Sequence, residues 1–415
     1  MPTVISARPS PAGEVDSAYA WLRLLVSVLL STIGGVGMWS IAVVLTTLQA
    51  DFGAARADIS LAYTAVMFGA VIGGPIFGRL SDRFGIAVPV AIGAVMLALG
   101  FALASQTTGI WQFALVHGLL IGVGTSASFG PVIADISLWF ARRRGVAVAI
   151  CSSGSYLAGT VWPLVIQPLA ASVGWRNTYL GIAVFCPCAM LPLLLVLRRR
   201  LPQAYRARPG NAATSVAAGA TGGAGNGLQF LLMVAALACC IAMAMPQVHI
   251  VAFCADLGYG SAHGAQMLSL MFGTGIISRL GFGWVADRIG AAPALLVSSS
   301  LQAASLLAYF GANGLASLYV VTAVFGLVQG GIVPTYTLFV RECYPPSEAG
   351  GRVGLVLSST LAGMAIGGWM SGAIFDATLS YRAAFLNGFA WNLLNMAIAT
   401  WLLLRLPRYR VAVST

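Results

Sequence analysis

The sequence predicts an all-α membrane protein in which twelve transmembrane helices form two pseudo-symmetric six-helix bundles. The first observation is composition: of the 415 residues, 59 % are hydrophobic and 8 % are charged, and the mean hydropathy is +0.89. A water-soluble protein with these values would expose too much apolar surface. The second observation is that apolar runs of about 20 residues, long enough to cross a bilayer as helices, recur along the whole chain. The third is a similarity between the two halves.

The apolar runs can be delimited in order, and the chain's 49 glycines fit closely packed membrane helices. Residues 1–20 are polar and contain proline, and the first run is too long for a signal sequence, so we expect no cleavable signal peptide. The twelve runs cover residues 22–48, 59–80, 87–105, 111–139, 146–171, 176–197, 229–254, 264–286, 291–312, 315–340, 351–376 and 382–404.

A stretch rich in Gly, Ala, Ser and Thr at residues 201–227 reads as a flexible linker. It divides the chain into an N-terminal bundle, residues 1–200, and a C-terminal bundle, residues 228–415. An even number of spans places both termini on the same side of the membrane.

All 22 basic residues are arginines, and they gather in alternate loops rather than along one face, which argues against nucleic-acid binding. Eighteen lie on the side of the termini, whereas only Arg56, Arg176 and Arg382 lie on the other. The termini are therefore expected in the cytoplasm. One arginine, Arg279, is left inside a span.

The halves repeat each other in sequence. The stretch GRLSDRFG at 78–85, after the second span, is matched by GWVADRIG at 283–290, after the eighth. Likewise RRRGVAVAICSSGSYLAG at 142–159 parallels GGRVGLVLSSTLAGMAIG at 350–367. A duplicated six-helix unit predicts a shared cavity between the halves, near the middle of the membrane.

Twelve spans in two halves, with G-x-L-x-D-R-x-G after the second span and its echo after the eighth, resemble the major facilitator superfamily. The resemblance implies gating roles for Asp82 and Arg83, and for their counterparts Asp287 and Arg288. Asp82 would contact a helix N-terminus across the interface between the halves in the outward-facing state, which is favourable on helix-dipole grounds. Ile86 and Ala87 stand where two basic residues often follow in the family.

Within the superfamily, the chain most resembles the monocarboxylate and oxalate–formate porter group. The resemblance rests on residues 39–60, on WFARRRGVAVAI at 139–150, on HIVAFCADLG at 249–258 and on Arg279 in the eighth span. It implies that Arg279 binds a substrate carboxylate. The sequence has no lysine, so it lacks the second cation of oxalate-type members, and Gly275 stands where some proton-coupled members carry an aspartate.

An independent physical argument also singles out Arg279. An arginine at the centre of a membrane helix costs about 2.5–3.5 kcal/mol on insertion scales, and no acidic residue lies three or four positions away. The side chain therefore needs a wet cavity or an anion, and a carboxylate fits the guanidinium fork. The alternative is a purely structural role, in which Arg279 pairs with Asp135 or with backbone carbonyls and locks the halves together.

Other polar residues inside the spans are candidates for the same pocket. His249 and His117 could hydrogen-bond the substrate or carry a proton, or could be core histidines. Gln329 could bind a substrate hydroxyl or another helix. For Tyr156 and Ser359, with its neighbour Ser358, helix packing is the alternative to substrate binding. Trp39 and Met38 could line an apolar part of the pocket.

These features predict a secondary transporter of a small organic monocarboxylate, of the lactate or pyruvate type. No catalytic set, phosphate-binding loop or metal-ligand spacing is evident, so we expect no enzymatic activity and no cofactor or metal, and a gradient rather than ATP as the energy source. The cysteines inside the spans read as small buried hydrophobic residues. A proton is the expected co-substrate, the lipid bilayer the expected surrounding, a bacterial inner (plasma) membrane the expected location, and a monomer the expected state.

Three alternatives remain open at this stage. An anion exchanger of the oxalate–formate type and a multidrug exporter would keep the fold and change the cargo. A membrane receptor without transport is a different class, and neither the linker nor the termini are long enough to hold the signalling domain that it would need.

Overall fold

The computed structural model describes residues 15–199, 226–312 and 314–405, and all regular elements in these ranges are helices. Eleven helical segments of the described ranges are long and apolar enough to span a membrane. The twelfth predicted span corresponds to α18, a 25-residue helix outside this set that packs along α12 and α14. Together with the family match reported below, this confirms the predicted fold.

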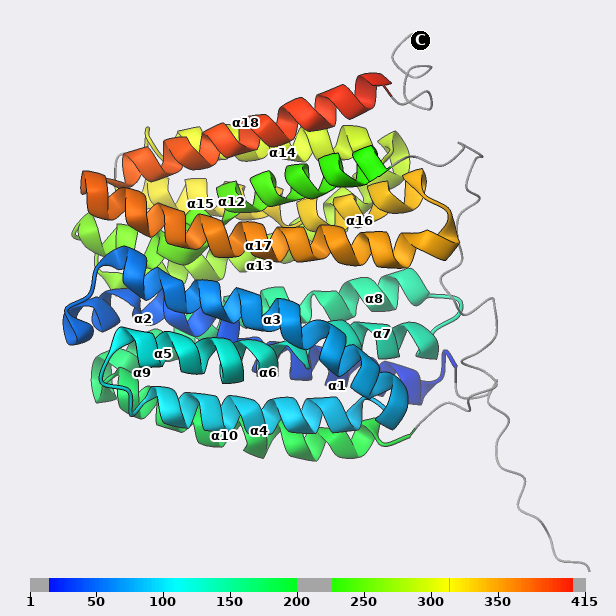
Figure 1. Ribbon diagram of the computed structural model, residues 1–415, viewed down its shortest axis with the longest axis horizontal. Coiled ribbons are helices and arrows are strands. Elements are labelled where there is room, and N and C mark those ends of the chain that lie inside the picture. Colours follow the sequence, from blue (N-terminus) through cyan, green and yellow to red (C-terminus); the bar gives the residue numbers. More distant parts are fainter. Residues whose placement is uncertain (1–14, 200–225, 313, 406–415) are drawn as a thin grey trace, which may run out of the picture.

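The N-terminal bundle occupies the lower half of Figure 1. Several of its spans consist of two or more helices in succession. Its helices are α1 (Ala18–Gly34) and α2 (Val36–Phe52), α3 (Arg56–Phe84), α4 (Ala87–Ala104), α5 (Ile110–Val116), a π-helical turn (His117–Gly122), α6 (Val123–Ser126) and α7 (Gly130–Trp139), α8 (Arg144–Ser152) and α9 (Gly154–Val173), and α10 (Trp175–Leu197).

The C-terminal bundle lies above it in Figure 1 and has the same order of long helices. The predicted linker falls outside the described residues except for its last two, which begin α12. Its helices are α12 (Asn226–Asp256), α13 (Ser261–Ile289), α14 (Ala291–Ala308), α15 (Leu315–Gln329) and α16 (Ile332–Cys343), α17 (Pro346–Thr378) and α18 (Tyr381–Arg405).

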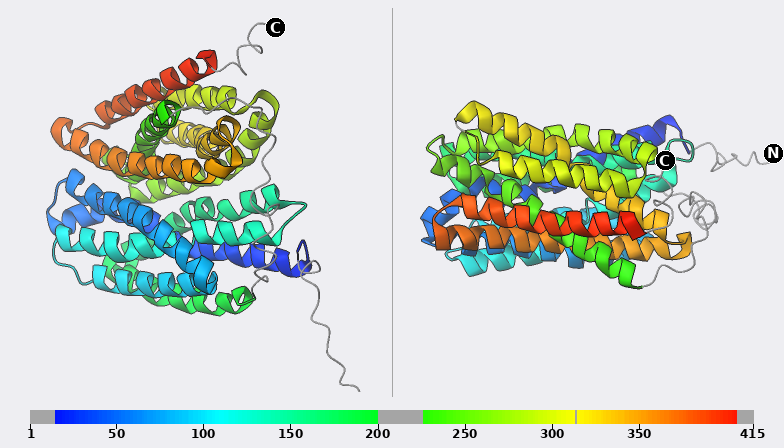
Figure 2. Two further views of the ribbon diagram at one scale, coloured as in Figure 1. Left: turned by 45° about the vertical axis from the view of Figure 1, so that its right-hand side comes forward. Right: turned by 90° about the horizontal axis from the view of Figure 1, so that it is seen from above.

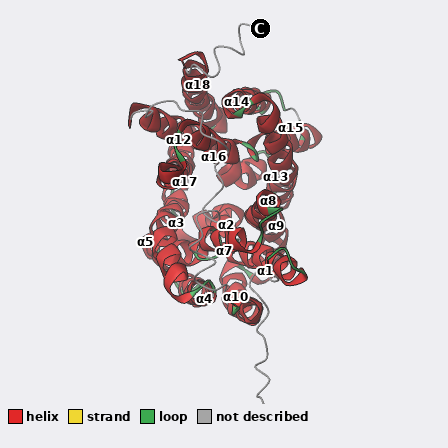
Figure 3. Cartoon of the chain, turned by 90° about the vertical axis from the view of Figure 1, so that its right-hand side faces the viewer, coloured by secondary structure: helices red, strands yellow, loops and turns green. Residues whose placement is uncertain are grey.

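The bundles meet along two main seams, where α3 packs on α17 and α9 packs on α13. Figures 2 and 3 show the two bundles side by side, with these helices facing each other. The described chain begins and ends at the same end of the molecule, on the right of Figure 1, which we call the terminal end. We call the opposite end, which holds the turn between α12 and α13, the distal end.

Four predicted spans are interrupted by helix breaks near their middle: at Gly35, at 127–129, at Ser153 and at Gly330 with Gly331. The last break lies where α13 comes close to the chain. A Cβ atom on Gly330 would overlap the carbonyl oxygen of Gly275 in α13, and one on Gly331 would overlap the side chain of Phe282. Discontinuous helices leave backbone groups without intrahelical partners, and in transporters such breaks cluster at binding sites.

Two arginines that the orientation count placed in loops are in fact buried. Arg23 lies in α1, is 1 % exposed and pairs with Asp135 at 2.7 Å. Arg56 is the first residue of α3 and is 6 % exposed. The prediction that Arg279 alone lies inside a span is therefore wrong: Arg23 already falls within the first apolar run, 22–48, and α3 begins three residues before its run, at Arg56.

Candidate carboxylate site between the bundles

Arg279 lies on α13, ten residues before its last residue, Ile289, and thus about 15 Å from the terminal end of the helix. Its side chain is partly buried and points across the seam between α13 and α9. The guanidinium Nη1 donates a hydrogen bond of 2.8 Å to the carbonyl oxygen of Ser152, in the other bundle. Its central carbon lies 4.2 Å from the centre of the Tyr156 ring.

The break between α8 and α9 provides the carbonyl that accepts this hydrogen bond. Ser152 is the last residue of α8, so its carbonyl belongs to the electronegative C-terminal end of that helix. A carbonyl dipole and an aromatic face are weak partners for a full positive charge. The buried Nε atom of Arg279 has no hydrogen-bond partner in the part of the chain that the structure describes.

No carboxylate within the described ranges neutralises Arg279. The alternative partner, Asp135, is bonded to Arg23 within the N-terminal bundle, as described above. The purely structural reading that paired Arg279 with Asp135 is therefore wrong. Its other form, a bond to a backbone carbonyl, is present through Ser152. The site thus holds a cation that bridges the bundles and retains donor capacity for an anion.

Tyr156, whose ring carries the guanidinium, is part of an aromatic cluster. Phe272 of α13 stands with its ring 5.3 Å from that of Tyr156 and 4.1 Å from that of Trp39, in α2. Two glycines make room for these rings. A Cβ on Gly159 would overlap the ring of Phe272, and one on Gly275 would lie 2.5 Å from Cε1 of Tyr156. The tyrosine ring therefore occupies the space into which a side chain at position 275 would extend.

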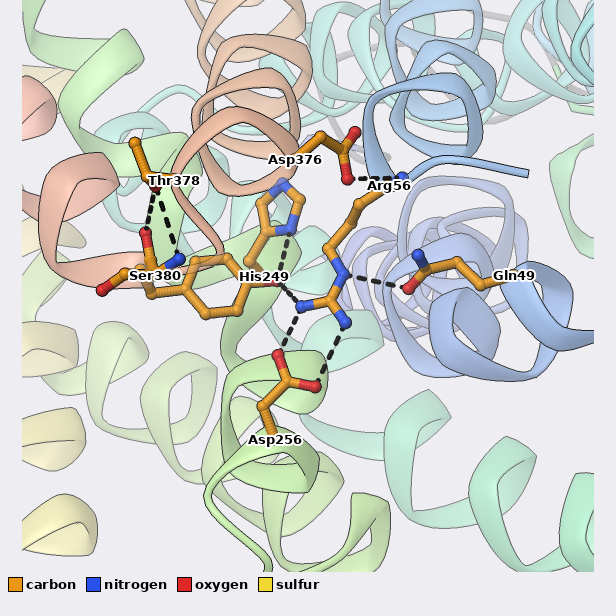
Figure 4. A network of polar contacts seen from close by, with 8 residues as sticks. Gln49, Arg56, His249, Asp256, Asp376, Thr378 and Ser380 are labelled. Carbon is orange, nitrogen blue, oxygen red and sulfur yellow. Dashed lines mark hydrogen bonds and ion pairs between the residues drawn. The ribbon is translucent and has the colours of Figure 1, made fainter. Parts of the chain in front are cut away.

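His249 lies elsewhere, on the distal side of the site. It is seven residues from the distal end of α12, whereas Arg279 is eighteen residues from the distal end of α13, so about 17 Å separates them along the helix axes. Its two ring nitrogens contact the Tyr381 hydroxyl at 3.1 Å and the Gly368 carbonyl at 2.8 Å. Figure 4 shows His249 in a polar network with Arg56. The structure does not bring it together with Arg279.

His117 is fully buried inside the N-terminal bundle. Its Nδ1 contacts the carbonyl oxygen of Phe113 at 2.9 Å, and its ring lies 3.9 Å from the Phe113 ring and 5.8 Å from the Tyr179 ring. Nε2 has no hydrogen-bond partner. These contacts are those of a packed core histidine.

Three further candidate pocket residues, Gln329, Ser358 and Ser359, lie in the C-terminal bundle. Gln329, at the end of α15, accepts a 2.6 Å hydrogen bond from Gln247 of α12, and its own Nε2 is buried without a partner. Ser359 bonds to the carbonyl of Leu355 within its own helix. No recorded side-chain contact joins Gln329 or Ser359 to Arg279, and Ser358 is half-buried.

The motif residues at the terminal end are exposed and make few contacts. Within the described ranges, neither Asp82 nor Asp287 has a recorded hydrogen bond or ion pair, and the guanidinium groups of Arg83 and Arg288 lie over the neighbouring rings Phe84 and Trp284. The predicted contact between Asp82 and a helix across the interface belongs to the outward-facing state, so its absence here does not test it.

Sequence reasoning missed two partners of this region. Ser152 acts through its backbone carbonyl, which residue type does not reveal, although the two serines before Gly154 are a usable signal of a helix break. Gln247 was overlooked beside Gln329. Met38 is half-buried, while Trp39 is 6 % exposed and its indole N–H has no partner. The described residues include no group of three or more His, Cys, Asp or Glu side chains that could hold a metal ion.

Comparison with known proteins assigns the family. The sequence profile described as Major Facilitator Superfamily matches residues 27–339 and 282–415. The protein belongs to this superfamily.

Members with curated names fall into two groups. Monocarboxylate transporter 13 of Bos taurus is 26 % identical over 402 residues, which cover 95 % of this chain and 91 % of the relative. The MFS-type transporter opdF of Penicillium oxalicum is 27 % identical over 324 residues, or 78 % and 74 % of the two chains. The agnestins efflux protein AgnL12 of Paecilomyces divaricatus is 26 % identical over 298 residues, or 70 % and 65 %. The protein is thus a major facilitator that resembles the monocarboxylate transporters.

Proposed function

We propose that this major facilitator is a secondary transporter of a small organic monocarboxylate of the lactate or pyruvate type, with Arg279 as the group that binds the carboxylate. The observation that carries the proposal is that Arg279 sits at the seam between the bundles with a carbonyl and an aromatic ring as its partners, and with no carboxylate paired to it among the described residues. Similarity to a monocarboxylate transporter over 95 % of the chain supports the same cargo.

The contacts of Arg279 suggest how cargo is coupled to movement. In the empty site, the cation is held against Ser152 of the other bundle by one hydrogen bond. A substrate carboxylate would accept two parallel hydrogen bonds from the guanidinium and cancel its charge. Because the neutral complex is cheaper to keep out of water than the bare cation, substrate lowers the barrier to the state in which both ends are closed.

The test is uptake of radiolabelled pyruvate and L-lactate into proteoliposomes. Truncating one partner of a buried charge pair costs at least about 2 kcal/mol, so Arg279→Gln should lower kcat/KM about 30-fold or more. Arg405→Gln is the matched control, because Arg405 lies in the same bundle, is exposed and stacks on Trp401. Equal transport by wild type and Arg279→Gln would refute the assignment.

A thermal-shift measurement separates binding from transport. Pyruvate should raise the unfolding temperature of wild type and of Arg405→Gln, and should leave that of Arg279→Gln unchanged. Dicarboxylates should stabilise the protein less, since the sequence supplies no lysine as a second cation.

Proton coupling and orientation are part of the proposal. The arginine distribution supports cytoplasmic termini, with the terminal end inside the cell, and we propose the plasma membrane as the location. The expected bacterial source has no support from the named relatives, which are mammalian and fungal. Uptake with a proton should acidify the lumen of proteoliposomes that contain a pH-sensitive dye, and uptake without acidification would contradict coupling.

A second candidate is export of an organic acid, favoured by the match to a named efflux protein over 70 % of the chain. It uses the same Arg279 site and reverses the direction. Export would be favoured if release of the acid from preloaded vesicles greatly exceeds uptake under the same gradient. It would also be favoured if external pyruvate does not compete with an unlabelled acid inside the vesicles.

A further inference from the structure

The distal end of the molecule is closed by a polar cluster that joins the two bundles. At its centre is Arg56, the first residue of α3, which donates hydrogen bonds through both terminal nitrogens to the two carboxylate oxygens of Asp256, in α12; the Nη2–Oδ1 distance is 3.1 Å. Nη1 also contacts the Tyr381 hydroxyl at 2.8 Å, and Nε donates to Gln49 at 2.9 Å. Figure 4 shows these groups converging on Arg56.

A second carboxylate accepts hydrogen bonds from the backbone at the start of α3. Ala55, the N-cap residue of α3, has no side-chain oxygen to satisfy the first N–H groups of its helix. Asp376 of α17 supplies it from the other bundle: its Oδ1 accepts from the Arg56 N–H at 3.0 Å and its Oδ2 from the Ala57 N–H at 2.7 Å. An anion at a helix N-terminus is favoured by the helix dipole as well. The start of α3 is thus completed by a residue about 320 positions away.

The helices beneath this cluster are in close contact. On α17, Gly368 and Gly372 face α3: a Cβ on Gly372 would lie 3.0 Å from backbone atoms of Ala57, and one on Gly368 would lie 3.0 Å from the ring of Tyr63. Small residues four apart allow helix backbones to approach each other in membranes. His249 bonds to the carbonyl of Gly368 and to Tyr381, and so connects this seam to the cluster.

The terminal end differs from the distal end in its polar contacts. Hydrogen bonds recorded between the bundles toward the distal end also include Gln167 to Ser261 at 3.3 Å and Thr64 to the Ala365 carbonyl at 2.8 Å. The motif acids Asp82 and Asp287 have no such contact in the described ranges. The recorded hydrogen bond between the bundles nearest the terminal end is that of Arg279 to Ser152, about 15 Å inside it. The recorded ion pair that joins the bundles, Arg56 with Asp256, lies at the distal end.

We propose that Arg56, Asp256, Asp376 and Tyr381 form a distal latch, which is the gate that holds this transporter closed at the distal end. The latch suits a gate because it can open at modest cost. The Asp256 side chain is 35 % exposed and belongs to the last residue of α12, so we expect separation to return both charges to water rather than to lipid. Opening would also separate Asp376 from the N-terminus of α3. The helix cap and the ion pair would therefore be lost together.

The latch can be tested by spin-label distances without any substrate, so the result does not depend on the proposed function. Labels at Gln106 and Ala316, exposed residues at the distal ends of the two bundles, report their separation by double electron–electron resonance, with Cys188 and Cys343 replaced by serine. Wild type should show mainly the short distance. Arg56→Gln should raise the ratio of long-distance to short-distance populations about tenfold, since hydrogen bonds to charged groups are lost.

The chain offers a matched control on the same face. Arg176 forms an ion pair with Asp51 at 2.5 Å, but both residues belong to the N-terminal bundle. Arg176→Gln should therefore leave the distance distribution of wild type unchanged. If Arg56→Gln gives the wild-type distribution, or if Arg176→Gln shifts it equally, the latch is refuted.

A second variant guards against misfolding of Arg56→Gln. Asp376→Ala removes the cap from α3 at a half-buried position and leaves the pair of Arg56 with Asp256 in place, so it creates no buried uncompensated charge. It should shift the populations in the same direction. A folded Asp376→Ala protein with the wild-type distribution would overturn the proposal by itself.

Discussion

Gly275 offers a direct test of how the binding region is built. A Cβ at this position would lie 2.5 Å from Cε1 and 2.7 Å from Cδ1 of Tyr156, whereas carbon atoms pack comfortably at about 3.5–4.0 Å. In Gly275→Ala the tyrosine ring must therefore move by about 1 Å. The ring is 7 % exposed and confined by Phe272, and it carries the guanidinium of Arg279 on its face.

The expected cost follows from two opposed effects. Overpacking a buried site costs about 1–3 kcal/mol, while replacing glycine by alanine inside a helix stabilises by up to about 1 kcal/mol. Gly281→Ala on the same helix meets no atom within 4 Å, so it receives the gain without the cost. Gly275→Ala should therefore be about 1–3 kcal/mol less stable than Gly281→Ala.

The assay is equilibrium unfolding in mixed detergent micelles, combined with pyruvate uptake. Gly275→Ala should also weaken uptake, because displacement of Tyr156 disturbs the platform under Arg279. Tyr156→Leu should relieve the clash, so the double variant should be more stable than the sum of the single changes by about 1 kcal/mol or more. Equal stability of Gly275→Ala and Gly281→Ala would refute this account of the packing.

Three further predictions concern buried polar groups. Arg23→Gln should lower the free energy of unfolding by about 3–5 kcal/mol, because it leaves Asp135 buried without its cation. Adding Asp135→Asn should recover most of this loss in unfolding experiments. A cost below about 1 kcal/mol for Arg23→Gln alone would contradict the pairing. His117→Phe should keep the pH profile and KM of uptake, since the ring is enclosed by aromatic neighbours; a shifted profile would return His117 to the transport pathway. Asn395→Leu should lower the free energy of unfolding by about 1–3 kcal/mol, because Asn395 accepts a 2.6 Å hydrogen bond from the buried Tyr336 hydroxyl. If the variant unfolds at the same denaturant concentration as wild type, this hydrogen bond does not contribute to stability.

The distribution of apolar residues determined the fold to a large extent. Membrane helices satisfy their own backbone hydrogen bonds, so a local run of apolar residues suffices to place each span. The repeat of DRFG at 82–85 and DRIG at 287–290 then defined the two halves. Sequence also singled out Arg279 as an isolated cation without a nearby acid, because charge and burial tendency are properties of the residue and its immediate neighbours.

The tertiary structure decided what each polar group contacts. Arg279 and Ser152 are 127 positions apart, and Arg56 and Asp376 are 320 apart. No local pattern encodes which helices will be adjacent or at what depth their residues will align. The depth of His249 relative to Arg279, the burial of Arg23 and the cap that α17 provides for α3 all depend on how one helix is placed along another. The sequence by itself thus determined which segments cross the membrane and that Arg279 is a cation inside one of them. Only the packing of the two bundles decided which partners that charge has and which end of the molecule is fastened, because side-chain contacts between distant segments exist only once the helices have been brought together.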